Sequence, residues 1–209
     1  MLILDDPDAV VTRARELSAG ARRAVLGIVG PPGGGKSTLA ETVVAALGAE
    51  AALVPMDGFH LAQGELVRLG RRDRMGAPDT FDAAGYVALL ERLRANADEV
   101  VYAPAFRREI EEPIAGAIPV GRSVPLIVTE GNYLLVDDGD WARVRPLLDE
   151  CWYVEMDEET RLSRLIGRHI EFGKTPDAAR EWVMRSDQAN AAVSAATRDR
   201  ADVIVRLAT

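Results

Sequence analysis

The sequence contains few residues of the kinds that carry disulfides, membrane spans or nucleic-acid contacts. Its 209 residues include one cysteine, Cys151, so no intramolecular disulfide can form and a cytoplasmic location is expected. The formal net charge is −8, which argues against a nucleic-acid partner, because phosphate backbones need a concentrated basic face. No apolar run approaches the roughly 18 residues of a membrane span, and the first residues lack the basic region of a signal peptide. We therefore expect no membrane insertion.

Lysine is also scarce, and two of the 25 basic residues are lysines. One of them, Lys36, lies in the run Gly30-Pro31-Pro32-Gly33-Gly34-Gly35-Lys36-Ser37, which matches the phosphate-binding pattern G-x-x-x-x-G-K-[ST]. Glycines let backbone N–H groups approach a phosphate, and a helix N-terminus adds unpaired amides and partial positive charge. The motif predicts a nucleoside triphosphate site formed by Gly30, Gly33, Gly34, Gly35, Lys36, Ser37 and Thr38, with Lys36 on the β- and γ-phosphates and Ser37 on Mg²⁺.

The segments around this loop follow the order strand, loop, helix. Apolar strands are expected at 23–29, 51–56, 123–129, 151–156 and 201–205, and helices at 8–19, 38–47, 82–95, 141–148, 158–171 and 177–192. Strands that alternate with helices imply a parallel sheet covered on both faces. The sequence thus predicts one α/β domain over residues 1–209, with the fold of P-loop nucleoside triphosphate hydrolases and a five-stranded parallel sheet.

Polar residues follow two of the predicted strands, where ligands bind in sheets of this type. Asp57 follows the strand at 51–56 and is a candidate base for an attacking hydroxyl or a ligand to Mg²⁺-bound water. Its other interpretation is a turn-forming Asp before Gly58. Glu130 ends the strand at 123–129 and fits an acidic Mg²⁺ partner opposite Ser37, or else a solvated strand end.

A basic helical face precedes a loop that contains Gly and Pro. Arg161, Arg164, Arg168 and His169 have the spacing of one helix face, which is either solvated or aimed at phosphates. The loop after it can act as a hinge, so residues 161–176 are a candidate lid. Arg164 and Arg168 would then neutralise charge on the transferred phosphoryl group. Lys174, the second lysine, lies in this lid and is either solvated or functional.

Taken together, these motifs resemble the uridine kinase, pantothenate kinase and phosphoribulokinase group of phosphate-loop kinases. Residues 56–61, 76–82 and 112–114 look closest to bacterial proteins named nucleoside/nucleotide kinase-like, some of them fructose transport system kinase. The resemblance covers about residues 8–207. It implies that Asp57 is the base, that Ser37 and Glu130 serve Mg²⁺, that Arg164 and Arg168 bind phosphates, and that the chain can form a homodimer.

The acceptor side is less defined. Two further segments, the basic stretch 61–81, which lacks periodicity and is expected to be mobile, and an irregular hairpin at 100–120, are candidate insertions beside the substrate. We assign His60, Tyr102 and Arg107 to the acceptor, although His60 could equally be structural. Arg107 stands where the related pattern usually has Asp, which favours an anionic compound.

The predicted activity is an ATP- and Mg²⁺-dependent kinase that phosphorylates a hydroxyl of a small metabolite such as a nucleoside, sugar, sugar phosphate or pantothenate-like compound. A nucleotide-binding regulator or an ATPase linked to sugar transport is the alternative. A guanine-specific switch would need an Asn/Thr-Lys-x-Asp motif, which neither lysine supplies.

Overall fold

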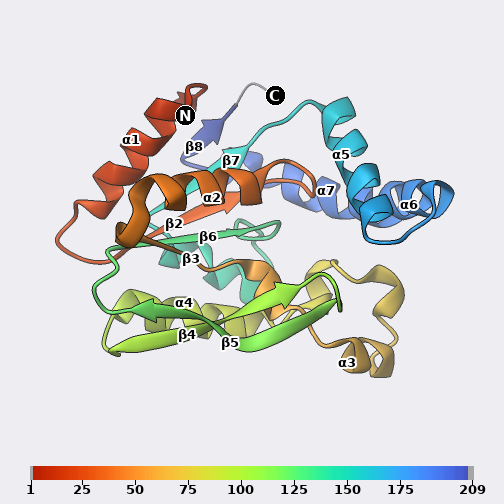
Figure 1. Ribbon diagram of the computed structural model, residues 1–209, viewed down its shortest axis with the longest axis horizontal. Coiled ribbons are helices and arrows are strands. Elements are labelled where there is room, and N and C mark those ends of the chain that lie inside the picture. Colours follow the sequence, from red (N-terminus) through yellow and green to blue (C-terminus); the bar gives the residue numbers. More distant parts are fainter. Residues whose placement is uncertain (1, 207–209) are drawn as a thin grey trace.

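In the computed structural model, which describes residues 2–206, six parallel strands form the central sheet (Figure 1). Their order across the sheet is β1 (Leu2–Leu4), β8 (Val203–Val205), β7 (Glu150–Val154), β2 (Ala24–Val29), β6 (Leu126–Gly131) and β3 (Ala51–Leu53). The prediction of a parallel sheet is confirmed, but its count of five strands is wrong. The sixth strand, β1, is an edge strand of three residues, two of them exposed, so its sequence carries no burial pattern.

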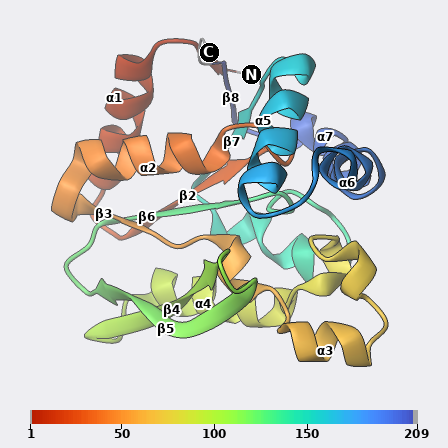
Figure 2. The ribbon, with the colours of Figure 1, turned by 45° about the vertical axis from the view of Figure 1, so that its right-hand side comes forward.

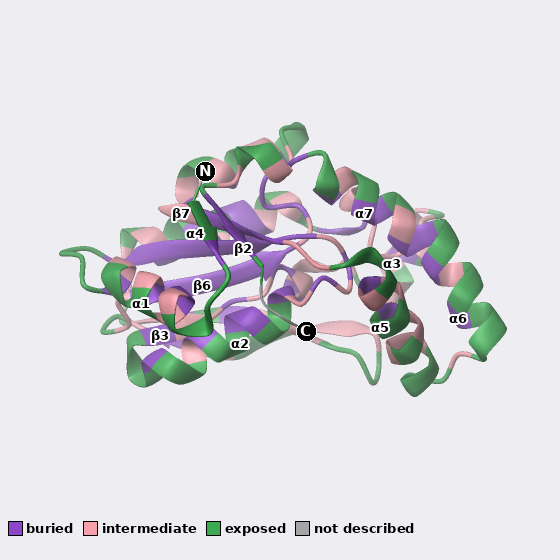
Figure 3. Cartoon of the chain, turned by 90° about the horizontal axis from the view of Figure 1, so that it is seen from above, coloured by how far each residue is buried: buried purple, intermediate pink, exposed green. Residues whose placement is uncertain are grey.

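Helices cover both faces of this sheet (Figures 1 and 3). On one face lie α1 (Pro7–Ser18) and α2 (Lys36–Leu47), and on the other lies α4 (Ala83–Ala95). Strand β2 contributes side chains to the hydrophobic core on each face of the sheet. Leu26 and Ile28 pack with α1 and α2, whereas Val25 and Val29 pack with α4. The predicted cap of α4 is confirmed, since the Asp82 carboxylate accepts the N–H of Gly85 at 2.8 Å.

Three connections differ from the expected elements. The predicted helix at 141–148 consists of two 3₁₀ turns, Gly139–Arg143 and Arg145–Leu147, because Pro146 cannot donate a helical hydrogen bond. The predicted strand at 51–56 ends at Leu53, and a 3₁₀ turn at Met56–Phe59 follows it. The stretch 61–81 contains a short helix, α3 (Gln63–Arg68), and two 3₁₀ turns, Arg72–Arg74 and Pro78–Thr80, which its lack of periodicity did not indicate.

The hairpin at 100–121 and the predicted lid segment at 161–176 lie outside the central sheet. Strands β4 (Val100–Arg107) and β5 (Glu112–Gly121) form a separate antiparallel pair with an irregularity between Ala103 and Ala105, as the sequence predicted. Helix α5 (Glu158–Glu171) has the predicted bounds. The predicted helix at 177–192 is instead α6 (Pro176–Trp182), a π-helical turn (Val183–Asp187) and α7 (Gln188–Ala195). Figure 2 shows α5 and α6 together at one edge, above α3. Within residues 2–206, every helix is too short or too polar to cross a bilayer.

Candidate active site

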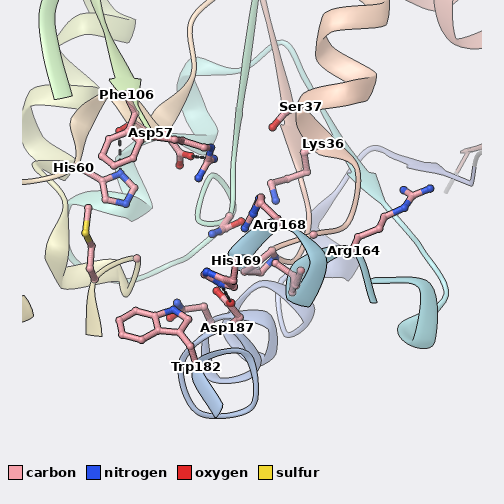
Figure 4. Close-up of a pocket in the computed structure, with 18 of the residues that line it drawn as sticks. Lys36, Ser37, Asp57, His60, Phe106, Arg164, Arg168, His169, Trp182 and Asp187 are labelled. Carbon is pink, nitrogen blue, oxygen red and sulfur yellow. Dashed lines mark hydrogen bonds and ion pairs between the residues drawn. The ribbon is translucent and has the colours of Figure 1, made fainter. Parts of the chain in front are cut away.

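A cleft of about 310 Å³ lies at the carboxyl ends of the central strands. Its walls come from the loop after β2, the turn after β3, the segment 72–81, the β4–β5 turn, the end of β6 and the helical segment from α5 to α7. Figure 4 shows Lys36 and Ser37 on one side of this cleft and Asp57, His60 and Phe106 on the other. Arg168 and His169 approach it from the lid. The structure therefore brings most of the predicted site residues to one place.

The loop after β2 has the backbone that phosphate binding requires. Gly33 and Gly35 adopt φ values of +76° and +88°, which residues other than glycine rarely adopt. A Cβ on Gly33 would lie 2.6 Å from Cγ of Leu165, so α5 packs directly on the loop. Helix α2 starts at Lys36 with no side-chain cap and no acidic residue in its first turn. Its N-terminal amides and positive dipole end are therefore available to an anion.

Lys36 is buried beneath this loop. Its ammonium donates to the carbonyl of Pro31 at 2.9 Å. Burial lowers the pKa of Lys36 to about 8, while the negative charges of Glu130 and Asp57 oppose that shift. The ammonium therefore keeps most of its charge near neutral pH and is held close to the place where phosphates approach the loop.

Ser37 and Glu130 meet across the neighbouring elements α2 and β6. The Ser37 hydroxyl donates to Oε1 of Glu130 at 3.2 Å. Burial is the main cause that raises the pKa of Glu130 to about 7, and repulsion from the Asp57 carboxylate is the second. A buried carboxylate with its pKa raised in this way lacks a sufficient positive partner. A hydroxyl and a carboxylate are the hard oxygen ligands that Mg²⁺ takes from proteins when phosphates supply the rest, so the pair fits this ion.

A dedicated metal site made of protein ligands alone is absent from residues 2–206, because no group of three or more His, Cys, Asp or Glu side chains is suitably placed.

Asp57 lies across the cleft from the loop, in the 3₁₀ turn after β3. Its Oδ2 accepts a hydrogen bond from Arg108 at 3.0 Å, and its side chain is 26% exposed against 42% for Arg108. Burial alone would raise the pKa of Asp57, but His60 and the positive charges of Arg108 and Lys36 hold it below its usual value. The carboxylate is thus ionised and able to accept a proton or a hydrogen bond.

His60 is anchored beside Asp57. Its Nδ1 lies 2.9 Å from the backbone oxygen of Asp57, and its ring packs 4.0 Å from Phe81 and 4.6 Å from Phe106 between centroids. Burial lowers the pKa of His60, so the imidazole is neutral at pH 7. His60 has structural contacts and also lines the cleft, so both of its sequence interpretations stay open.

The basic face of α5 divides into two parts. Arg164 and Arg168 line the cleft, as does His169, whose Nε2 lies 2.8 Å from Oδ2 of Asp187. Arg161 is instead 2% exposed, and it donates to the carbonyl of Pro32 at 3.0 Å and to the Glu158 carboxylate at 2.7 and 2.8 Å. Arg161 therefore supports the phosphate-binding loop from behind, whereas Arg164 and Arg168 line the cleft.

Two residues expected beside the acceptor lie elsewhere. Tyr102 and Arg107 are exposed on β4, and neither lines the cleft. The next residue, Arg108, reaches the cleft instead, because it begins the turn after β4 and escapes the alternation of the strand. The sequence could have indicated Arg108 through the pair Arg107-Arg108, because consecutive strand residues face opposite sides and one of the two arginines must then face the cleft.

The sequence did not single out Trp182 and Asp187, which also line the cleft. The ammonium of Lys174, in the predicted lid, lies 4.9 Å from the centroid of Trp182 at the end of α6, which is a cation–π contact. Trp182 immediately precedes the π-helical turn Val183–Asp187 and Asp187 is its last residue; such turns are frequent at functional sites. No pattern in the sequence marks a π turn, so this part of the cleft depends on the three-dimensional structure.

The chain was compared with known proteins. No family model matches it. It is 32% identical over 194 residues to "Putative uridine kinase C227.14" of Schizosaccharomyces pombe, covering 88% of this chain and 83% of that protein. It is 34% identical over 145 residues to "ATP-dependent kinase-like protein notR'" of Aspergillus versicolor, covering 65% of this chain and 84% of that one. A solved structure from Silicibacter sp. TM1040, described as a "putative fructose transport system kinase", is 35% identical with a TM-score of 0.86 and covers 95% of this chain and 98% of its own.

Proposed function

Since the chain belongs to the P-loop kinases of the uridine kinase group, and is thus a small-molecule kinase, we propose that it transfers the γ-phosphoryl group of ATP to a hydroxyl of a small metabolite. The observation that carries this proposal is the arrangement of the cleft. Lys36 and the Ser37–Glu130 pair lie on one side and Asp57 on the other, with Arg164 and Arg168 on the lid. Donor and acceptor sites on opposite walls are what phosphoryl transfer requires.

ATP would bind with its phosphates on the loop after β2. The backbone of Gly30, Gly33, Gly34 and Gly35 and the first amides of α2, from Lys36 to Thr38, would surround the β-phosphate. Lys36 would give up its bond to the Pro31 carbonyl and place its charge on the β- and γ-phosphates. Ser37 and Glu130 would hold Mg²⁺, which when bound neutralises charge between these phosphates.

The transfer itself depends on orientation and charge. The acceptor oxygen attacks the γ-phosphorus, the bond from that phosphorus to the β–γ bridging oxygen breaks, and ADP leaves. Asp57 would accept the proton of the attacking hydroxyl. Arg164 and Arg168 would stabilise the charge that develops on the transferred group when the lid lies over it.

The substitution Asp57→Asn tests this proposal. It removes the proton acceptor and leaves the phosphate-binding loop unchanged, so we expect kcat to fall about 10²- to 10⁴-fold while the Kd for ATP changes less than about twofold. ADP release would be followed over a panel of nucleosides, sugars, sugar phosphates, sugar acids and pantothenate, with Lys36→Ala as the blank. Asp73→Asn is the matched control, because Asp73 is exposed and lies outside the cleft lining.

Turnover of Asp57→Asn at the wild-type rate would contradict the role given to Asp57. ADP release that needs no acceptor would favour an ATPase, and nucleotide binding without any ADP release would favour a regulator. A cytoplasmic location and a homodimer stay predictions.

A further inference from the structure

The ion pair between Arg108 and Asp57 lies where the acceptor must bind. Arg108 donates from one guanidinium nitrogen to Oδ2 of Asp57 at 3.0 Å, and its guanidinium carbon lies 5.9 Å from the centroid of Phe106. If Asp57 accepts a proton from the acceptor, as proposed above, one of its two oxygens must face the hydroxyl. Arg108 holds Oδ2, and its positive charge beside the carboxylate weakens Asp57 as a base. Asp57 is therefore a stronger base when Arg108 binds another partner during the reaction.

The charges around this part of the cleft indicate what the new partner is. Three of the four carboxylates that line the cleft pair with a cation or a histidine: Asp57 with Arg108, Glu111 with Arg72 at 2.7 Å, and Asp187 with His169 at 2.8 Å. The fourth, Glu130, contacts Ser37 on the side of the phosphate-binding loop. Lys174 differs, because among residues 2–206 no carboxylate lies within 4.0 Å of its ammonium. On this side of the cleft a cationic acceptor would have no unpaired carboxylate to bind, whereas an anionic acceptor could bind the ammonium of Lys174.

We propose that the acceptor carries a carboxylate or phosphate group in addition to its hydroxyl, and that Arg108 leaves Asp57 to bind this group. The inference rests on the proposed function. Arg108 suits the role because a guanidinium offers a planar pair of N–H donors that matches either anion. It is 42% exposed at a turn between two strands, so its side chain can move without disturbing the core. Binding of the anion would then free Asp57 for the hydroxyl.

This arrangement couples recognition to catalysis. A neutral acceptor offers Arg108 no replacement for Asp57, so the base stays paired and its proton affinity stays lowered by the guanidinium. An anionic acceptor satisfies Arg108 and releases the base in the same event. Arg108 would thus be a specificity residue, and its removal should affect charged acceptors more than neutral ones.

The experiment uses two matched series of hydroxyl compounds in the ADP-release assay: glycerol, glycerate and glycerol 3-phosphate, and ribose, ribonate and ribose 5-phosphate. We expect kcat/KM of a charged member to exceed that of its neutral counterpart at least about tenfold, because the charge-assisted hydrogen bond is lost with the neutral compound. Comparing the carboxylate compounds with the phosphate compounds shows which of the two anions the cleft binds.

Variants assign the effect to one side chain. Arg108→Gln should raise KM for the charged acceptor about 10- to 100-fold and bring the charged-to-neutral ratio of kcat/KM near one, with the KM for ATP unchanged. Arg108→Lys should recover part of the ratio, since it restores the charge without the planar fork. Arg107→Gln is the matched control, because the neighbouring arginine is exposed and does not line the cleft. It should change KM less than about twofold.

Three results would overturn the inference. One is a neutral acceptor, in these series or among the nucleosides and sugars, that reacts as well as any charged compound. Another is an equal effect of Arg108→Gln and Arg107→Gln. Absence of ADP release above the Lys36→Ala blank with every compound would instead refute the proposed function, and the inference with it.

Discussion

Arg161 and Arg164 lie one turn apart on α5 and should respond to the same substitution in opposite ways. Arg161 is buried and donates to the Pro32 carbonyl, to Glu158 and to Gln188. Arg164 is exposed at the cleft, and its one hydrogen-bond partner within residues 2–206 is the sulfur of Met156 at 3.3 Å. Replacing each with methionine keeps an unbranched side chain and removes the charge. The pair therefore separates support of the loop from contact with a ligand.

The size of the stability loss follows from the contacts of Arg161. The Pro32 carbonyl is left without a donor behind the loop, which costs roughly 1.5–3 kcal/mol for a bond from a charged group. The Glu158 carboxylate is 59% exposed and can be hydrated, so the loss of that pair adds only about 0.5 kcal/mol. The bond to Gln188 adds about 1 kcal/mol. We expect Arg161→Met to lower the free energy of unfolding by roughly 3–4.5 kcal/mol and Arg164→Met by less than about 0.5 kcal/mol.

Guanidinium chloride unfolding, followed by circular dichroism, measures this difference. With a slope of roughly 5 kcal/mol per molar denaturant, Arg161→Met should lower the midpoint by about 0.6–0.9 M. Kinetics should show the reverse order: Arg164→Met should lower kcat by about tenfold or more, because a charge on the transferred group is left unopposed. If the unfolding midpoint of Arg164→Met is as low as that of Arg161→Met, the division of the helix into a supporting and a functional part is refuted.

Four further predictions concern the phosphate-binding loop, the Ser37–Glu130 pair and the core. Gly33→Ala places a Cβ 2.6 Å from Leu165 at a φ of +76°, so equilibrium titration with a fluorescent ATP analogue should show at least tenfold weaker binding, whereas Gly64→Ala, which meets nothing within 4 Å, should bind normally. Burial raises the pKa of Glu130 to about 7, so the carboxylate is protonated below that pH. The Mg²⁺-dependent affinity for nucleotide should therefore rise about tenfold per pH unit up to pH 7 and level off above it. The Glu130→Gln variant should lose this pH dependence. The same raised pKa means that Glu130 adds stability below the unfolded value near 4.5 and that this contribution declines as pH rises toward 7, which urea titrations at pH 5 and 8 can check. Cys151 is fully buried and its thiol pKa is raised by burial, so a thiol reagent should label it only as fast as the protein unfolds; labelling within seconds in native buffer would contradict its place in the core.

Local sequence was enough for the donor side of the cleft. The glycine run, Lys36 and Ser37 are contiguous, and their chemistry requires no partner from a distant element. Asp57 and Glu130 could be placed beside them because parallel strands align their carboxyl ends at one edge of the sheet. The helix bounds of α5 could be predicted for a similar reason, since Asp157 caps the helix through the N–H of Thr160 at 2.9 Å.

The acceptor side could not be predicted in the same way. Whether Arg107 or Arg108 faces the cleft depends on where β4 ends, and one residue of register reverses the side of the sheet. The edge strand β1 has no burial pattern because water covers much of it. The broken helix after residue 182 depends on a π turn that no local propensity marks.

The amino-acid sequence by itself determined the α/β fold and the phosphate-binding loop, because strand, glycines, lysine and helix are adjacent in the chain and act through backbone geometry. It also indicated that Glu130 lies at the end of a buried strand and that Asp57 follows a strand. The tertiary structure alone decided that Arg108 covers Asp57 and that Arg161 supports the loop while Arg164 faces the cleft. These assignments depend on which side chains meet across elements far apart in sequence, where burial and charge pairing outweigh local preference.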